Sequence, residues 1–417
     1  LQVPQECLIL TMQQNQKYFP LLDAQGKLMN RFLLVSNLQT DDPSHIIHGN
    51  ERVLRARLSD AEFFYKQDQK ASLESRLPKL ENVVYHNKLG SQAERVARLC
   101  DLSVAIAQAL DADAQQTLRA AALAKADLLT EMVGEFPELQ GVMGRYYALH
   151  DGETAAVAEA IEQHYRPRFA GDALPQSKTA AAVALADKLE TLVGIWGIGL
   201  IPSGDKDPYA LRRSALGILR MLMQYGLDVA PLLQAAYNTF PQGKLAADTV
   251  DEVAEFMQAR LAVLLQNDFA HDEVAAVLAK QPQNLGDINA KLAAVAAFKR
   301  LPEAAALAAA NKRVHNILKK NELPLGDINP NLLQQLEEQD LYQATQGLVP
   351  QINQALAHKD FQAALSVLAA VKPTVDAFFD KVMVMADDED IKRNRLALLR
   401  ALSRQMNAVA DIALLNE

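Results

Sequence analysis

The sequence predicts a mainly α-helical, multidomain protein with a small α+β segment at its N-terminal end. The 417 residues exceed what one hydrophobic core usually organises, so we expect several domains. Strand-like patterns are confined to residues 1–38, whereas from Asn87 onward apolar residues recur with the 3.6-residue period of helices. Glycine- and proline-bearing loops separate the helical runs, and they divide the chain into segments 1–80, 81–226, 227–298 and 299–417.

Composition limits the classes of function. The longest apolar stretch, residues 191–201, is interrupted by three glycines and is too short to span a bilayer, so we expect no membrane association. A net charge of −9 argues against indiscriminate binding to DNA or RNA but permits a local basic face. Cys7 and Cys100 lie far apart in apolar contexts, and we expect two buried, reduced thiols and a cytoplasmic protein. The opening residues "LQVPQECLIL" lack an initiator methionine, which suggests a piece of a longer polypeptide.

The N-terminal segment reads as strands followed by a helix. "CLILTM", "YFPLL" and "FLLVSNL" are the expected strands, and Asp23 to Gly26 is the expected hairpin turn, with Gly26 in the left-handed conformation. Residues 50–77 read as helix, which Pro78 ends.

Helix ends in the remaining sequence are marked by ordinary signals. Gly226 is a helix stop, and Asp387 or Asp388 caps a long C-terminal helix. In "SGDKDPYALRR" (203–213), Asp207 and Pro208 predict a cap and the first residue of a helix. Lys206, Arg212 and Arg213 then gather at a helix end that already carries positive partial charge, so they need either acidic partners within the fold or an external anion.

Motifs for nucleotide and hydrolytic chemistry are absent. The sequence holds no G-x-x-x-x-G-K-[ST] loop, no G-x-G-x-x-G after a strand, no G-x-S-x-G and no H-E-x-x-H. His45 and His48 have a spacing that suits a metal, but no further ligand accompanies them and we interpret them as surface residues. His150-Asp151-Gly152 reads as the end of one helix and the turn before the next.

Seven stretches, in order, resemble the beta subunit of bacterial glycyl-tRNA synthetase. They are "QKYFPLLDAQGKL", "GNERVLRARLSDAEFFY", "LAKADLLTEMVGEFPELQGVMGRYYA", "YRPRFAGDALP", "LADKLETLVGIWGIGLIPSGDKDPYALRRSALGILR", "ALAAANKRVHNIL" and "DAFFDKVMVMADDEDIKRNRLALL". The resemblance runs from residue 4 to 416 and implies an enzyme of two alpha and two beta subunits. It also implies that ATP, Mg²⁺ and glycine are handled by the alpha subunit. This chain is then expected to hold no cofactor and no catalytic residue, and to bind tRNA(Gly).

The helical middle resembles a degenerate HD-type phosphohydrolase domain. Gln92 stands where that superfamily has its first metal-binding histidine, Ala126-Asp127 stands for the His-Asp pair, and Asp187 is the last ligand. With both imidazoles gone, the nitrogen-rich site that hydrolysis needs is lost. We expect Asp127 and Asp187 to pair with buried cations. Lys206, Arg212 and Arg213 are the candidate counterions, with tRNA backbone contact as the alternative role.

The C-terminal segment resembles the all-helical anticodon-binding domain that several synthetases share. Basic and polar residues are concentrated in two of its helices, and a single-stranded anticodon loop is read by such side chains. The candidate tRNA contacts are Asn311, Lys312, Arg313, His315, Lys319, Lys392, Arg393 and Arg395. In a helix Lys312, His315 and Lys319 share one side.

Three arginines of the N-terminal helix add to the candidates. Arg52 and Arg55, with the neighbouring Arg57, either contact tRNA or pair with Asp60 and Glu62 along the helix. The residues 1–80 are expected to complete an α+β domain. Two other functions compete with a tRNA-binding subunit: a metal-dependent phosphohydrolase and a helical scaffold that binds only proteins.

Overall fold

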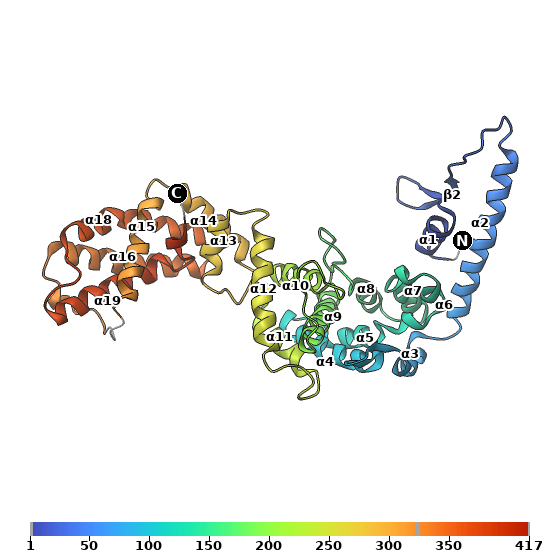
Figure 1. Ribbon diagram of the computed structural model, residues 1–417, viewed down its shortest axis with the longest axis horizontal. Helices are drawn as coiled ribbons and strands as arrows, with labels where there is room; N and C mark the ends of the chain where they lie inside the picture. Colours follow the sequence, from blue (N-terminus) through green and yellow to red (C-terminus); the bar gives the residue numbers. More distant parts are fainter. Residues whose placement is uncertain (1–2, 322–325, 416–417) are drawn as a thin grey trace. The chain divides into compact units, whose positions relative to one another are not determined.

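The computed structural model describes residues 3–321 and 326–415, and the chain forms two compact units (Figure 1). The first unit comprises Leu1–Met221 with Pro231–Val253, and the second comprises Leu222–Ala230 with Ala254–Glu417. Helices dominate both units, which confirms the predicted fold class. The finer division into four segments stays a prediction.

The first unit is built from short and long helices with two small antiparallel hairpins. Its elements are α1 (Gln5–Gln16), β1 (Phe19–Leu22), β2 (Leu28–Leu33), α2 (Ser44–Asp68), α3 (Leu73–Arg76), β3 (Val84–His86), β4 (Gly90–Ser91), α4 (Gln92–Leu110), α5 (Ala114–Leu123), α6 (Glu131–Glu135), α7 (Val142–His150), α8 (Ala155–Gln163) and α9 (Lys178–Gly197). Short 3-10 turns lie at Leu77–Asn82, Ala126–Leu129 and Pro137–Leu139. The dividing points between the units fall within α10 (Leu211–Tyr225), α11 (Val229–Asn238) and α12 (Thr249–Leu265).

The first expected strand is a helix. "CLILTM" lies in α1, which buries Cys7, Leu8, Thr11 and Met12, a spacing that belongs to one face of a helix. A short apolar run does not distinguish a strand from a buried helical turn, and packing decided between them. α1 lies beside α2 at the N-terminal end of the chain (Figure 1).

The expected hairpin turn is confirmed, but the second strand is misplaced: β2 ends at Leu33, and residues 34–38 of the expected strand "FLLVSNL" are not in a strand. β1 and β2 pair antiparallel, with Phe19 opposite Leu33 and Leu22 opposite Leu28. Gly26 sits in their turn at a φ of 76°, which a residue with a Cβ rarely adopts. The second hairpin, in which Val84 of β3 faces Ser91 of β4, was not predicted because its strands are too short to show alternation.

The core of the first unit surrounds α9. This helix is buried on nearly its whole circumference, and α4, α5 and α8 pack against it. Ser91 begins α4 with a capping box that includes Glu94. The hydrophobic core that α9 joins also contains α1 and α2, so residues 1–80 and the helical middle share one core.

Helix boundaries follow the predicted signals with two exceptions. The helix expected over residues 50–77 ends at Asp68, and Pro78 does not end it but lies in the 3-10 turn Leu77–Asn82. Gly226, at a φ of 66°, follows α10, and Asp388 caps α19 (Glu389–Met406) by accepting from the backbone of Asp390 and Ile391. The helix expected from Pro208 begins three residues later, at Leu211, because Ala210 has a left-handed φ of 54°. Asp207 still caps it, since its carboxylate accepts from the N–H groups of Leu211 and Arg212 at 2.8 and 2.9 Å.

The second unit is a bundle of helices. It contains α13 (His271–Leu278), α14 (Ile288–Lys299), α15 (Ala304–Lys319), α16 (Leu336–Ala357), α17 (Phe361–Ser366), α18 (Lys372–Lys381) and α19, with 3-10 turns at Pro330–Leu332, Val367–Val371 and Ile412–Leu414. α15, α16, α18 and α19 pack against one another (Figure 1). α19 contributes Leu396, Leu399, Leu402 and Met406, all fully buried at helical spacing.

Other expectations from single residues have mixed outcomes. Both cysteines are free thiols, but Cys7 is buried whereas Cys100 is only half-buried. Among the described residues no helix is long and apolar enough to cross a membrane. His150 lies near Gln69, and the Asp151 carboxylate accepts from the backbone of Leu73 at 2.7 Å, so this pair closes a helix end as expected.

Candidate nucleic-acid interface and the degenerate metal site

The predicted ligand positions of the metal site lie on separate elements. Asp187 is on α9, Asp127 and Ala126 are on the 3-10 turn after α5, and Gln92 begins α4. Asp127, Ala126 and Asp187 are buried, and Gln92 is half-buried. Asp187 is paired with buried cations, as predicted, but these are Arg95 and Lys125 and not the cations of residues 206–213.

An ammonium group lies against Asp187. The Nζ atom of Lys125 is 2.9 Å from Asp187 Oδ1 and 2.9 Å from His164 Nε2. Since His164 Nδ1 lies 2.5 Å from the carbonyl oxygen of Ile161, the proton of the ring is on Nδ1 and Nε2 accepts from Lys125. Burial lowers the pKa of Lys125 to about 8, against the opposing field of Asp187. Burial also lowers the pKa of His164 well below its usual value, so this imidazole is neutral.

Two arginines complete the charge network. Arg95 contacts Asp187 at 3.0 Å and Glu190 at 3.0 Å, and Arg98 contacts Glu190 at 2.9 Å. The Arg95 guanidinium also lies 4.2 Å from the centre of the Tyr85 ring. Burial alone would raise the pKa of Asp187, but the positive charges of Lys125 and Arg95 outweigh it and hold that pKa well below its usual range.

Asp127 has no ion pair in the described part of the chain; one of its oxygens is held by the backbone, and the other, Oδ1, is buried without a hydrogen-bond partner there. Its Oδ2 atom accepts from the N–H groups of Gly141 and Gly144 at 2.6 and 3.0 Å. Burial raises its pKa to about 6, although these hydrogen bonds and Lys125 favour the charged form.

The donor set does not fit the divalent metal of an HD site. The carboxylate of Asp187 is occupied by Arg95 and Lys125, and His164, the imidazole that lies beside it, accepts from an ammonium. Over residues 3–321 and 326–415 no three His, Cys, Asp or Glu side chains are arranged to hold a metal. The arrangement stabilises the fold and offers no hydrolytic centre.

The prediction that Lys206, Arg212 and Arg213 are the counterions of Asp127 and Asp187 is wrong. Lys206 and Arg213 are exposed, and the Arg212 guanidinium donates to the carbonyl of Gly204 at 2.5 Å. Arg95 and Lys125 take the counterion role because α4 and the turn after α5 pack against α9. Arg213 instead lines a cavity.

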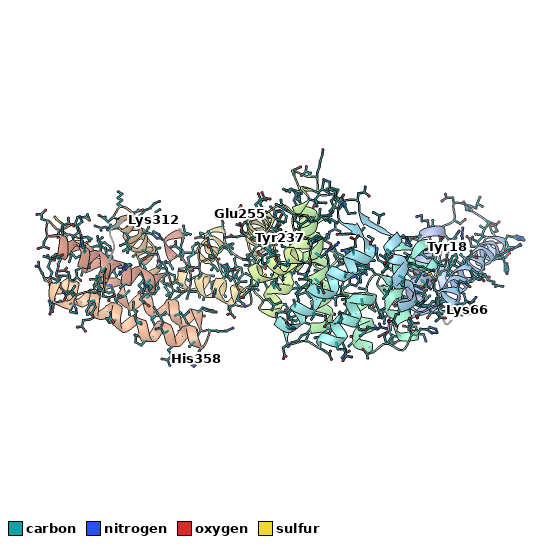
Figure 2. All side chains as sticks on the ribbon, turned by 90° about the horizontal axis from the view of Figure 1, so that it is seen from below. Tyr18, Lys66, Tyr237, Glu255, Lys312 and His358 are labelled. Atoms are coloured by element: carbon teal, nitrogen blue, oxygen red, sulfur yellow. The ribbon has the colours of Figure 1, made fainter. Side chains whose placement is uncertain are left out.

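In the second unit, α15 presents a basic face. Lys312, Arg313, His315 and Lys319 are exposed, and in Figure 2 Lys312 lies at the edge of the ribbon. The Arg313 guanidinium stacks 4.3 Å from the centre of the Phe379 ring. A cavity of about 340 Å³ on this face is lined by Lys312, Arg313, Asn316 and Lys320, with Ala309 and Ile317. Lys320 was not among the predicted contacts, although its spacing of eight from Lys312 places it on the same side.

Two predicted contacts are internal residues. Asn311 is fully buried and hydrogen-bonds Asn407 at 2.8 Å. Arg395 is 4% exposed, pairs with Glu338 at 2.7 Å and donates to the carbonyl of Met383. These side chains are unavailable to RNA, so the structure removes both from the candidates.

The remaining predicted contacts lie on surfaces. On α19, Arg393 is exposed and Lys392 is half-buried beside Glu389 at 3.3 Å. On α2, Arg52 and Arg55 are exposed, and no ion pair with Asp60 or Glu62 is found in the described part of the chain. Glu62 pairs with Lys66. Contact of these cations with tRNA stays a prediction.

Sequence reasoning missed the network around Asp187, although a signal existed. Asp187, Lys188 and Glu190 interrupt a helix that is otherwise apolar all round, and buried charges require partners. Lys125 is likewise flanked by alanines. The sequence shows that partners must exist, but it does not show which cations supply them.

Comparisons with known proteins agree with this architecture. Residues 1–279 match the family model described as glycyl-tRNA synthetase beta subunit, and residues 307–413 match that of the DALR anticodon binding domain. These matches place the chain in a family of aminoacyl-tRNA synthetase subunits.

Similar curated proteins specify the family. The glycine–tRNA ligase beta subunit of Neisseria meningitidis is 75% identical over all 417 residues, and that of Ralstonia nicotianae is 56% identical over 416. The chain belongs to the glycyl-tRNA synthetase beta-subunit family. It spans 61% of the length of the first relative and 60% of the second.

Proposed function

We propose that this chain binds tRNA(Gly) as part of the beta subunit of glycine–tRNA ligase. The supporting observation is the exposed basic face of α15, which lies in the region that matches an anticodon-binding domain. Lys312, Lys319 and Lys320 are exposed there, and Arg313 forms a flat surface with Phe379. Cations hold the phosphates of a single-stranded loop, and stacked planar groups receive its bases.

The chemical step belongs to another chain in this proposal. ATP, Mg²⁺ and glycine are bound by the alpha subunit, in an assembly of two alpha and two beta chains in the cytoplasm. The free thiols of Cys7 and Cys100 suit such a reducing compartment. The phosphohydrolase alternative is not proposed, because Lys125 and Arg95 occupy the Asp187 carboxylate that a metal would need.

Filter binding of labelled tRNA(Gly) over 50–200 mM KCl tests the proposal. The variant K312Q/K319Q should have the melting temperature of the wild type, since both side chains are exposed. The plot of log K for tRNA binding against log salt concentration should become less steep by roughly 1.4–1.8. The control K359Q removes an exposed charge from the loop after α16 and should leave the slope unchanged.

Two outcomes would contradict the proposal. One is a wild-type chain without affinity for tRNA(Gly) at 50 mM KCl. The other is glycine-dependent exchange of pyrophosphate into ATP by the chain alone, because that reaction would place the adenylate site here.

A further inference from the structure

A cavity in the first unit gathers three cations. Its volume is about 340 Å³, and its lining includes Gln140, Tyr165, Arg168, Lys188, Arg213 and Ser214. These residues come from four segments: the turn after α6, the loop after α8, α9 and the first turn of α10. The cavity therefore depends on the tertiary fold and is not the side of a single helix.

The cations of this cavity are not neutralised by carboxylates. Lys188 is 8% exposed, and its ammonium donates to the carbonyl of Tyr165 at 3.1 Å. The Arg168 guanidinium donates to the carbonyl of Gln140 at 3.3 Å. The Arg213 side chain has no hydrogen bond or ion pair with any described residue.

Three carboxylates lie nearby and are engaged elsewhere. Asp187, whose charge acts on Lys188, is paired with Arg95 and Lys125. Glu138 lines the cavity and accepts from the amide of Gln14 at 2.5 Å. Asp172 accepts from the backbone N–H groups of Arg168 and Ala173 at 2.6 and 2.8 Å. The lining thus carries three positive charges and one negative charge.

Tyr165 and Ser214 also line the cavity. The Tyr165 hydroxyl is buried and has no hydrogen-bond partner in the described part of the chain. Arg213 and Ser214 are in the first turn of α10, whose N–H groups at Leu211 and Arg212 are already capped by Asp207. Two guanidinium groups and an ammonium match the oxygens of a phosphate group.

We propose that this cavity binds a phosphate group of the RNA backbone, an inference that rests on the proposed tRNA-binding function. The ring of Tyr165 is the aromatic surface in the lining, and Lys125 and Arg168 already lie 4.2 and 5.5 Å from its centre. Because this ring is already covered by cations, the cavity recognises charge rather than a nucleobase. Of the cations at residues 203–213, only Arg213 lines this cavity, and the external anion is its partner in the proposal.

The test uses the whole chain and the variants R168Q, R213Q and R168Q/R213Q, with K79Q as control. Lys79 is exposed in the same unit, so this control removes one charge outside the cavity. For each single arginine variant, the plot of log K for tRNA(Gly) against log salt concentration should be less steep by roughly 0.7–0.9. The ratio of wild-type to variant affinity then shrinks about threefold between 50 and 200 mM KCl. The melting temperature of R213Q should match the wild type, because Arg213 has no partner among the described residues to lose.

A second arm measures melting temperature with inorganic phosphate and with AMP, against chloride at equal ionic strength. Stabilisation by phosphate that R168Q/R213Q abolishes, together with the lowered slope, supports the proposal. If tRNA binds but the cavity variants keep the wild-type slope, the inference is overturned and the proposed function stands. An unchanged slope overturns the inference even if phosphate or AMP stabilises the wild type and not the double variant, because the cavity would then bind a free anion and not RNA. If the wild type binds no tRNA, the proposed function fails and this inference fails with it.

Discussion

Replacing Asp187 with asparagine should destabilise the first unit strongly. The substitution keeps the shape of the side chain and removes the charge that faces Arg95 at 3.0 Å and Lys125 at 2.9 Å. Arg95 keeps Glu190 as a partner, but Lys125 keeps no ion pair among the described residues and only His164 accepts its hydrogen bond there. Breaking a buried pair by removing one partner leaves an uncompensated buried charge.

The size of the effect has a lower and an upper bound. Losses of this kind are about 3–5 kcal/mol. Lys125 can escape part of this loss by releasing its proton, because burial has already lowered its pKa to about 8 in the fold. We therefore expect a loss of about 3–5 kcal/mol, which for a unit of this size lowers the melting temperature by roughly 6–20 °C.

The single tryptophan supplies the assay. Trp196 lies on α9 with Asp187 and is 8% exposed, so its fluorescence during urea unfolding reports this helix. D101N, which changes an exposed aspartate on α4, is the matched control and should alter stability by less than about 0.5 kcal/mol. The double variant K125M/D187N should recover at least about 1 kcal/mol relative to the sum of the single losses. A D187N chain within about 1 kcal/mol of the wild type at pH 7 would refute the reasoning.

Three further predictions concern groups around these sites. Burial raises the folded pKa of Asp127 to about 6 from an ordinary 3.8, so its protonation stabilises the fold below that value and the gain is lost as pH rises through 6. The unfolding free energy of the wild type relative to D127N should therefore rise by roughly 2.4 kcal/mol from pH 7.5 to 4, and a flat difference in urea titrations would contradict this. G144A should destabilise by about 1–3 kcal/mol, because a Cβ there would lie 2.6 Å from Ile161 and 3.0 Å from Asp127 Oδ2. G134A, whose Cβ meets nothing within 4 Å, should be neutral or slightly stabilising in the same measurement. R395M should weaken the second unit by about 3–5 kcal/mol in calorimetry yet leave the salt slope for tRNA unchanged, whereas a lowered slope with normal melting would restore Arg395 as an RNA contact.

Local signals in the sequence determined most helices and their ends. The 3.6-residue period, Gly226 after α10 and Asp388 before α19 act through neighbours within one or two turns, so a short window contains the relevant interactions. The turn at Gly26 is local in the same sense.

The tertiary structure decided what each charged side chain faces. Asn311 and Lys312 are adjacent in α15, yet one is buried against Asn407 and the other is exposed. On α19, Arg393 is exposed whereas Arg395 lies against Glu338. Segments distant in sequence decide which face of a helix is covered. A cluster of cations in the sequence therefore did not show which of them form internal ion pairs and which are exposed.

The same reason explains the misassigned counterions and the first strand. Lys125 and Arg95 reach Asp187 because three helical segments pack together, while the nearer cations at 206–213 remain outside. "CLILTM" became a helix because its apolar side found a core that includes residues beyond position 120. Desolvation and packing act between segments that are distant in sequence, and local sequence patterns do not show which of these segments come into contact.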